Sequence, residues 1–183
     1  MNVERFAIEG VLLITPPRFA DSRGFFSEAY NKARFAAAGL DETFIQDNQS
    51  RSRKGVVRGL HCQIGANTQG KLVRVLRGSI WDVAVDIRTG SPTYGQHVSA
   101  VLSAENGSQL WVPGGFLHGF MALEDDTDVL YKVNAPYDRA AERGVIWNDP
   151  ALALPWPEVS EAIVSDKDME LPVLADCEPW YTL

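Results

Sequence analysis

Cysteine is scarce in this chain of 183 residues, which contains only Cys62 and Cys177. Two cysteines so far apart exclude a disulfide framework and the paired ligands of a structural zinc site. Histidine is nearly as rare, with residues at positions 61, 97 and 118 only. None of them has the close His-x-His spacing typical of metal sites in barrels, and no glutamate follows at short spacing. We therefore expect no transition-metal centre.

Long apolar runs and an excess of positive charge are also missing. No stretch approaches the roughly 20 apolar residues that span a bilayer, and the N-terminus lacks the layout of a signal peptide. The chain has 17 Lys and Arg against 24 Asp and Glu, a formal net charge of −7. This balance argues against general nucleic-acid binding, because phosphates need a basic surface. We expect a cytoplasmic protein that binds neither nucleic acid nor membrane.

What the sequence has instead is a series of short β-rich runs separated by Gly, Asn, Ser or Pro, without repeats or linkers. Closely spaced short strands with turn residues between them are typical of an antiparallel sandwich or barrel. The sequence therefore predicts a single all-β domain over residues 1–183. Its strands are expected at 11–15, 24–30, 56–63, 71–78, 79–88, 97–103, 109–113, 119–124, 128–134 and 144–148.

Two short helical segments are expected beside these strands. Asn31 is placed to cap a helix over 31–38 (NKARFAAA), and Gly39 is placed to end it. Near the C-terminus, beyond a Pro-rich stretch, Ser165 is placed to cap a last turn around SDKDME.

Strand alternation places two polar side chains on apolar faces. Successive side chains of a strand point to opposite faces, so Lys71 lies with two valines of its strand and Tyr131 with two valines of another. This is the setting of a polar group inside a barrel. The pattern alone also allows Lys71 to be a solvated strand residue, and it favours Tyr131 as a core tyrosine whose hydroxyl finds a partner.

The run RGLHCQ at 58–63 poses a sharper question, because strict alternation puts Arg58 and His61 on opposite faces. For both to serve one site, the backbone must bend or bulge between them, and Gly59 tolerates such a bend. The alternative is that Arg58 faces water and His61 is a core histidine. The local pattern leaves both interpretations open.

Several longer motifs, read together, closely resemble the dTDP-4-dehydrorhamnose 3,5-epimerases of the cupin superfamily. They follow one another over roughly residues 20–170: DSRGFFSEAYN, FIQDNQS, VVRGLHCQ, QGKLVRVLRGSIWDVAVDIR, SPTYGQ, LSAEN, QLWVPGGFLHGF, LYKV, GVIWND and SDKD. The resemblance implies a cupin-type jelly-roll barrel with a few short helices. It also implies a homodimer that works without a metal or an organic cofactor.

The resemblance further implies a reaction. The family's substrate is dTDP-4-dehydro-6-deoxy-α-D-glucose (dTDP-4-keto-6-deoxyglucose), whose sugar is inverted at C3 and C5 to give dTDP-4-dehydro-β-L-rhamnose. Carried over by motif, His61 resembles the catalytic base, Tyr131 the acid on the other face of the sugar, and Asp168 the partner of the histidine. Arg58 and Lys71 resemble the residues that grip the ligand near the reacting carbonyl.

The remaining site residues follow from the same motifs. Tyr137 corresponds to the aromatic residue that stacks on thymine, and Cys62 departs from the family, which often has an aromatic residue after the catalytic histidine. We expect that departure to change packing and not function. Further positions that the resemblance places around the nucleotide and sugar are Arg23, Glu28, Gln46, Asp47, Asn48, His118, Glu142 and Lys167.

Three other functions compete with this one. The nearest is an epimerase that inverts C3 only, in another deoxysugar pathway, and the motifs do not separate it. A non-catalytic barrel that binds sugar nucleotides has no need of His61, Asp168 and Tyr131 together. A metal-dependent cupin oxygenase requires a tight histidine cluster, which the sequence does not offer.

Overall fold

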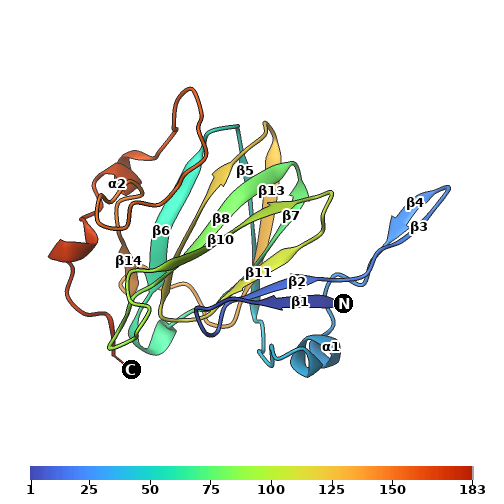
Figure 1. The fold of residues 1–183 in the computed structure, drawn as a ribbon, viewed down its shortest axis with the longest axis horizontal. Coiled ribbons are helices and arrows are strands. Elements are labelled where there is room, and N and C mark those ends of the chain that lie inside the picture. Colours follow the sequence, from blue (N-terminus) through green and yellow to red (C-terminus); the bar gives the residue numbers. More distant parts are fainter. Residues whose placement is uncertain (183) are drawn as a thin grey trace.

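Two β-sheets that face each other form the body of the protein (Figure 1). The computed structural model describes residues 1–182. The six-stranded sheet has the order β1 (Asn2–Arg5), β2 (Leu12–Thr15), β11 (Gln109–Val112), β7 (Lys71–Arg77), β13 (Thr127–Val133) and β5 (Gln46–Ser52). The five-stranded sheet has the order β10 (His97–Ser103), β8 (Ser79–Asp86), β12 (Phe116–Ala122), β6 (Val57–Gln63) and β14 (Glu142–Gly144).

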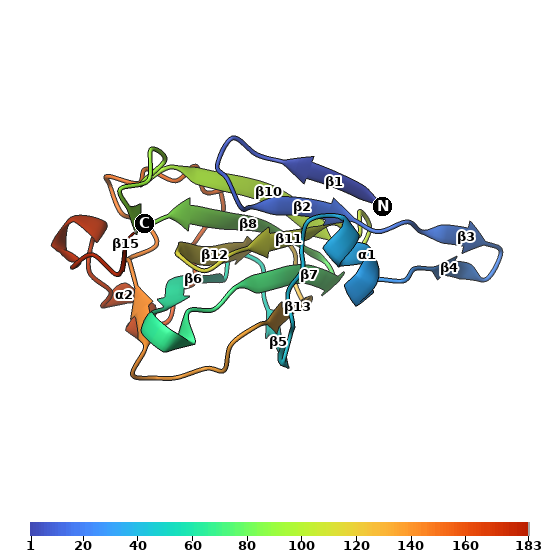
Figure 2. The ribbon, with the colours of Figure 1, turned by 90° about the horizontal axis from the view of Figure 1, so that it is seen from below.

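The smaller elements lie around these sheets (Figure 2). β3 (Phe19–Asp21) and β4 (Gly24–Phe26) form a hairpin, and β9 (Arg88–Thr89) pairs in parallel with β15 (Tyr181–Thr182). The helices are α1 (Lys32–Ala37), α2 (Asp166–Met169) and the 3-10 turns η1 (Gly65–Asn67) and η2 (Leu174–Asp176). The predicted all-β jelly-roll class with a few short helices is confirmed. Asn31 and Ser165 cap α1 and α2 as predicted.

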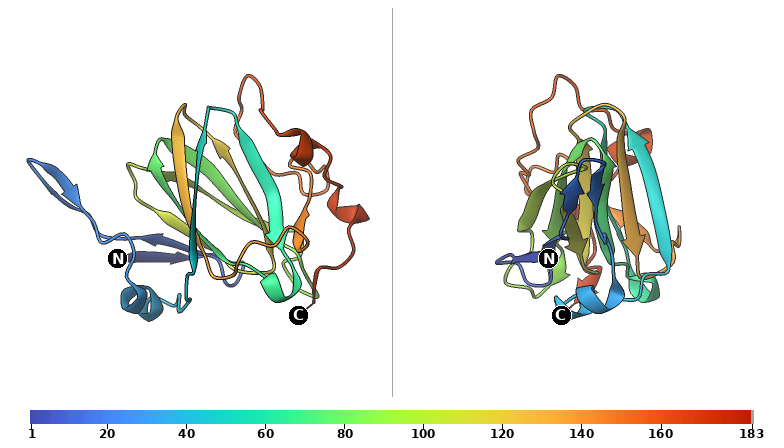
Figure 3. Two further views of the ribbon diagram at one scale, coloured as in Figure 1. Left: turned by 180° about the vertical axis from the view of Figure 1, so that it is seen from behind. Right: turned by 90° about the vertical axis from the view of Figure 1, so that its right-hand side faces the viewer.

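Apolar side chains fill three layers. Val73, Val75 and Val129 pack between the sheets, while Leu72 turns to the outer face of the six-stranded sheet and meets Phe35 of α1. The C-terminal segment covers the outer face of the five-stranded sheet (Figure 3). There the ring of Trp156 packs on that of Trp81. Because this segment covers the outer face, the residues on both faces of β8 are buried.

An extra residue in β6 brings Arg58 and His61 to the same face. His61 pairs with His118 and Arg58 with Phe120, so three steps on β6 match two on β12. Gly59, between them, has a φ of +123°, which favours glycine. A Cβ at Gly59 would lie 2.6 Å from the Cα of the neighbouring strand at Gly119. Of the two interpretations of RGLHCQ, the bulge at Gly59 is therefore correct.

Gly59→Ala is expected to destabilise the protein by about 2–5 kcal/mol, because backbone strain and overpacking act together. Gly90→Ala is the matched control: Gly90 also has a positive φ, of +91°, but a Cβ there meets nothing within 4 Å. It should lose only about 1–2 kcal/mol. Urea unfolding of both variants measures the difference, and equal losses would contradict a close approach at Gly59.

Candidate active site

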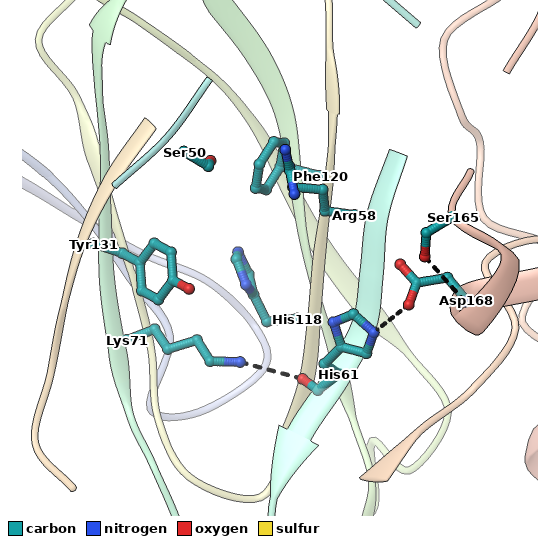
Figure 4. Close-up of a pocket in the computed structure, with 9 residues that line it drawn as sticks. All are labelled: Ser50, Arg58, His61, Lys71, His118, Phe120, Tyr131, Ser165 and Asp168. Carbon is teal, nitrogen blue, oxygen red and sulfur yellow. Dashed lines mark hydrogen bonds and ion pairs between the residues drawn. The ribbon is translucent and has the colours of Figure 1, made fainter. Parts of the chain in front are cut away.

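A pocket of about 280 Å³ opens between the two sheets (Figure 4). Strands β5, β7 and β13 of one sheet and β6 and β12 of the other supply its walls, and α2 closes one side. Six predicted site residues therefore meet in one place, together with three that were not predicted. The lining residues are Ser50, Arg58, His61, Lys71, His118, Phe120, Tyr131, Ser165 and Asp168.

His61 and Asp168 form a hydrogen-bonded pair where α2 begins. The Ser165 side chain accepts a hydrogen bond from the Asp168 N–H at 3.2 Å, and this cap fixes the position of Asp168. Asp168 Oδ1 lies 2.8 Å from His61 Nε2, and the Gly59 N–H donates to Oδ2 at 3.4 Å. Because an ionised carboxylate only accepts, Nε2 carries the hydrogen, and Nδ1 of His61 is left to exchange protons.

The charge of Asp168 suits this pairing. Burial raises the pKa of the Asp168 carboxyl, but the hydrogen bond and charge of His61, with the Gly59 N–H, outweigh burial and hold the pKa below its ordinary value. Asp168 is therefore ionised at neutral pH. An ionised carboxylate on Nε2 orients the imidazole and stabilises the imidazolium that forms when Nδ1 takes a proton.

Lys71 and Tyr131 reach the pocket from the opposite sheet, so the solvated alternative for Lys71 is wrong. The Lys71 ammonium donates to the carbonyl oxygen of His61 at 3.3 Å. Burial lowers the pKa of Lys71 and raises the pKa of Tyr131. Tyr131 thus keeps its proton at neutral pH, and Figure 4 places its ring across the pocket from His61.

Arg58 is fixed at the pocket wall by β5. Its Nε donates to Ser52 Oγ at 3.1 Å, and its Nη2 donates to the carbonyl oxygen of Arg51 at 3.2 Å. A guanidinium is charged at any ordinary pH. Arg58 therefore adds a second fixed positive charge to the pocket beside that of Lys71.

A smaller hollow of about 110 Å³ continues from the pocket and shares His61, Lys71 and Tyr131 with it. Two predicted residues, Tyr137 and Glu142, line it, and a third, Lys167, lies against Glu142. Glu142 Oε2 accepts from the Tyr137 hydroxyl at 3.1 Å and lies 2.5 Å from Lys167 Nζ.

These contacts hold a half-exposed aromatic ring at the mouth of the pocket. Burial raises the pKa of Glu142, but the hydrogen bonds and charge of Lys167 and Tyr137 outweigh it and leave the pKa below its ordinary value. Glu142 is thus an ionised anchor for the Tyr137 hydroxyl, and the Tyr137 ring is 54% exposed.

Five further predicted residues line neither the pocket nor the smaller hollow. Arg23 bonds to Asp21 at the tip of the β3–β4 hairpin, and Glu28 pairs with Arg34. Gln46 and Asn48 bond to each other at 2.7 Å, in register with the interior residues of β13. Asp47 points to the other face of β5, where it pairs with Lys132. The binding roles of Arg23, Glu28, Gln46, Asp47 and Asn48 stay predictions.

The sequence did not single out Ser50, Phe120 or Ser165 as lining residues. Ser50 lies opposite Val129, on the same face as Tyr131, and its hydroxyl is buried without a partner among residues 1–182. Alternation along QDNQSRS, started from Asn48, would have found Ser50. Phe120 lies two residues beyond His118 on β12, so alternation started from His118 would have found it as well.

Residues 1–182 contain neither a metal-binding cluster nor a membrane-spanning helix. Within residues 1–182, no three His, Cys, Asp or Glu side chains are grouped so that they could hold a metal ion. Across the same residues, no helix has the length and hydropathy needed to cross a membrane.

Comparison with known proteins decides the family. A model of the dTDP-4-dehydrorhamnose 3,5-epimerases matches residues 5–176. The chain belongs to this family. It is 50% identical to a dTDP-4-dehydrorhamnose 3,5-epimerase of Sinorhizobium fredii over 96% of this chain and 91% of the relative. The resemblance inferred from the motifs is therefore confirmed.

Solved structures of the family agree. The fold matches that of a dTDP-6-deoxy-D-glucose-3,5-epimerase from Legionella pneumophila, solved with dTDP-4-keto-L-rhamnose, at a TM-score of 0.93 and 44% identity, over 97% and 94% of the two chains. A 3′-monoepimerase from Streptomyces bikiniensis, solved with dTDP-quinovose, matches at a TM-score of 0.88 and 33% identity, over 93% and 86%. Two reaction types thus share this fold.

Proposed function

We propose that this epimerase inverts C3 and C5 of the sugar in dTDP-4-dehydro-6-deoxy-α-D-glucose and forms dTDP-4-dehydro-β-L-rhamnose. One observation carries the proposal: His61 and Tyr131 come from facing sheets and flank a single pocket, with Asp168 behind His61. A base and an acid on opposite sides of one ligand are what inversion at a carbon centre needs.

The reaction begins with loss of a proton beside the C4 ketone. Nδ1 of His61 takes the C3 proton, and the electrons of the C–H bond move onto the C4 oxygen, which gives an enolate. Asp168 stabilises the imidazolium that results. Lys71 and Arg58 supply preorganised positive charge for the oxyanion.

Protonation from the other side completes the inversion. Tyr131 gives its phenolic proton to C3 on the face away from His61. The His61 imidazolium then releases the C3 proton to solvent, and the Tyr131 phenolate takes a proton from solvent, so both side chains return to their starting states. C5 flanks the same ketone as C3, so the same enolate chemistry inverts C5. The small hollow beside the sugar leads to Tyr137, whose exposed ring is placed to stack on the thymine of the nucleotide.

Inversion of C3 alone is the second candidate, because a monoepimerase shares the fold. Sequence identity favours inversion at both C3 and C5, because the chain is 50% identical to a 3,5-epimerase and 33% identical to the monoepimerase. Incubation with dTDP-4-dehydro-6-deoxy-α-D-glucose, followed by NMR of the product, separates the two. We expect dTDP-4-dehydro-β-L-rhamnose. A product inverted at C3 alone would establish the second candidate, and unchanged substrate would refute both.

Activity is expected to survive exhaustive chelation. The proposed proton transfers use only side chains of this protein, and Lys71 and Arg58 carry the charge that a metal would supply. Dialysis against EDTA, followed by the product assay, measures this. A loss of activity that one divalent ion restores would contradict the proposed mechanism.

We further propose a homodimer in which the β3–β4 hairpin docks on a second copy. Figure 1 shows the hairpin projecting from the body, and it exposes Phe19, Phe25 and Phe26 by 60–69%. Isolated two-stranded hairpins are marginally stable, and clustered exposed aromatic residues mark an interface. A docked hairpin would also place Arg23 near the pocket of the second copy. This position would let Arg23 contact the ligand bound there, which is its predicted role.

Light scattering at micromolar concentration is expected to give twice the chain mass. Phe25→Asp combined with Phe26→Asp should shift the protein toward monomer, because two charges would be buried in the interface. Tyr94→Asp is the control, since Tyr94 is 45% exposed and lies outside the hairpin. A monomeric wild type, or equal shifts in the hairpin and control variants, would refute this dimer.

We also propose that residues 1–183 act as one domain in the cytoplasm. The two large sheets share one apolar core. Cys62 and Cys177 are free thiols, which suits a reducing compartment.

A further inference from the structure

A second histidine–carboxylate pair lies behind the pocket. His118 lines the pocket from β12, and its Nε2 is 2.7 Å from Oδ1 of Asp82 on the neighbouring strand β8. Asp82 is 0% exposed and does not line the pocket. Its Oδ2 has no hydrogen-bond partner among residues 1–182. An acidic side chain is rarely buried so completely unless a specific contact requires it.

Two groups near Asp82 oppose the effect of burial on its carboxyl. Burial raises the pKa of the Asp82 carboxyl above its ordinary value, and His118 and the positive charge of Lys71 offset only part of that rise. Lys71 reaches the same interior and lines the pocket beside His118 (Figure 4). The 2.7 Å contact sets Nε2 of His118 directly against Oδ1 of Asp82, so the ring nitrogen with the hydrogen is Nε2 whenever that carboxylate accepts.

The pocket has few side chains that can accept a hydrogen bond from the sugar, and His118 in this tautomer is one of them. Arg58 and Lys71 can only donate, and Asp168 is already engaged by His61 and Gly59. The sugar of the proposed substrate carries hydroxyls at C2 and C3, and each brings a hydrogen that needs an acceptor. The uncharged side-chain acceptors on the walls are His118 Nδ1 and the hydroxyl oxygens of Ser50, Tyr131 and Ser165. Of these, only Nδ1 in this tautomer carries no hydrogen of its own.

We propose that Asp82 is a positioning residue that holds His118 with its hydrogen on Nε2, so that Nδ1 accepts a hydrogen bond from a hydroxyl of the bound sugar. Asp82 itself touches no substrate and acts only through His118. If the carboxyl were protonated, it would donate to Nε2 and move the ring hydrogen to Nδ1. Nδ1 would then face the hydroxyl as a second donor. The inference rests on the proposed function, because it assigns one contact of the proposed substrate.

The tautomer can be observed without substrate. Protein labelled with ¹⁵N-histidine contains three labelled rings, at positions 61, 97 and 118, and His118→Asn identifies the signals of His118 by their loss. Two-bond ¹H–¹⁵N spectra of the wild type are expected to show hydrogen on Nε2 and a bare Nδ1. In Asp82→Asn this preference should weaken, since an amide can either donate or accept. A bare Nε2, or hydrogen on both nitrogens in the wild type, would overturn the proposal.

Kinetics provide the second readout. Asp82→Asn should lose about tenfold or more in kcat/KM, chiefly as a raised KM, because the hydroxyl contact exists in the ground state as well as the transition state. Asp86→Asn is the control for a merely structural role. Asp86 is equally buried on the same strand, but it bonds to Arg88, Ser91 and Thr93. That variant should lose stability and keep its KM.

A double variant isolates the route through His118. His118→Asn places an amide near the Nδ1 position and has no tautomer to fix, so adding Asp82→Asn should cost less than about threefold further in kcat/KM. A larger further loss, or an Asp82→Asn single variant with unchanged KM, would overturn the positioning role. If the wild type failed to epimerise the keto-sugar, the proposed function would fall, while the tautomer spectrum would still report on Asp82.

Discussion

His61→Ala is expected to lose both epimerisation and exchange of substrate protons with solvent. Without the imidazole, no group at this face of the pocket can take the C3 proton, so the enolate does not form. Removal of a general base typically costs about 10²–10⁴-fold in rate, and more where the base works with a carboxylate. Rates are measured by NMR of the product in H₂O and of deuterium uptake in D₂O.

Two further variants sharpen this result. Asp168→Ala should also lose activity with the fold intact, because the Nε2 hydrogen of His61 loses its acceptor. His97→Ala is the control, since His97 lies on β10 at the edge of the five-stranded sheet and does not line the pocket. Near-normal rates in His61→Ala, or equal losses in His97→Ala, would refute the assignment of the base.

Tyr131→Phe is expected to separate proton exchange from inversion. The variant keeps the ring and its packing but has no proton to give. The enolate should still form beside Lys71, and His61 should return a solvent proton to the original face. In D₂O, substrate should therefore gain deuterium without inversion, or with inversion slowed much more than exchange, by about 10²-fold or more.

The control for this variant is Tyr94→Phe, which removes the hydroxyl of an exposed tyrosine outside the pocket and should behave as wild type. Inversion by Tyr131→Phe at the wild-type rate would mean that Tyr131 is not the acid. Loss of exchange together with inversion would show that Tyr131 is needed to form the enolate, which the proposed division of roles does not allow.

Most strands were predictable because their periodicity is strong. Runs such as KLVRVLRG and SIWDVAVDIR gave β7 and β8 within two residues of their ends. β5 was missed because its residues, QDNQSRS, are polar throughout, and only its pairing with β13 makes them a strand. The run predicted at 24–30 is a strand only over Gly24–Phe26, since it belongs to a short hairpin whose partner, β3, was not foreseen.

The sequence identified many residues of the site, but it did not show how they are placed relative to one another. Alternation grouped Lys71 and Tyr131 with valines but left open whether Lys71 was solvated. It also could not decide whether Arg58 and His61 share a face, because a bulge leaves no periodic signal. The pairing of His61 with Asp168 joins residues 107 positions apart through a four-residue helix. Only the family resemblance suggested it. The contact between Asp82 and His118 carries no local signal of any kind.

The measurement that tests the central claim most directly is the position of deuterium in the product of the wild-type enzyme. The protein is incubated with dTDP-4-dehydro-6-deoxy-α-D-glucose in D₂O, and the inverted product is examined by NMR and mass spectrometry. If one ketone activates both neighbours and the new protons come from solvent-exchanged side chains, C3 and C5 should each carry deuterium. An inverted product without deuterium would contradict an enolate route, and label at C3 alone would contradict inversion at both centres.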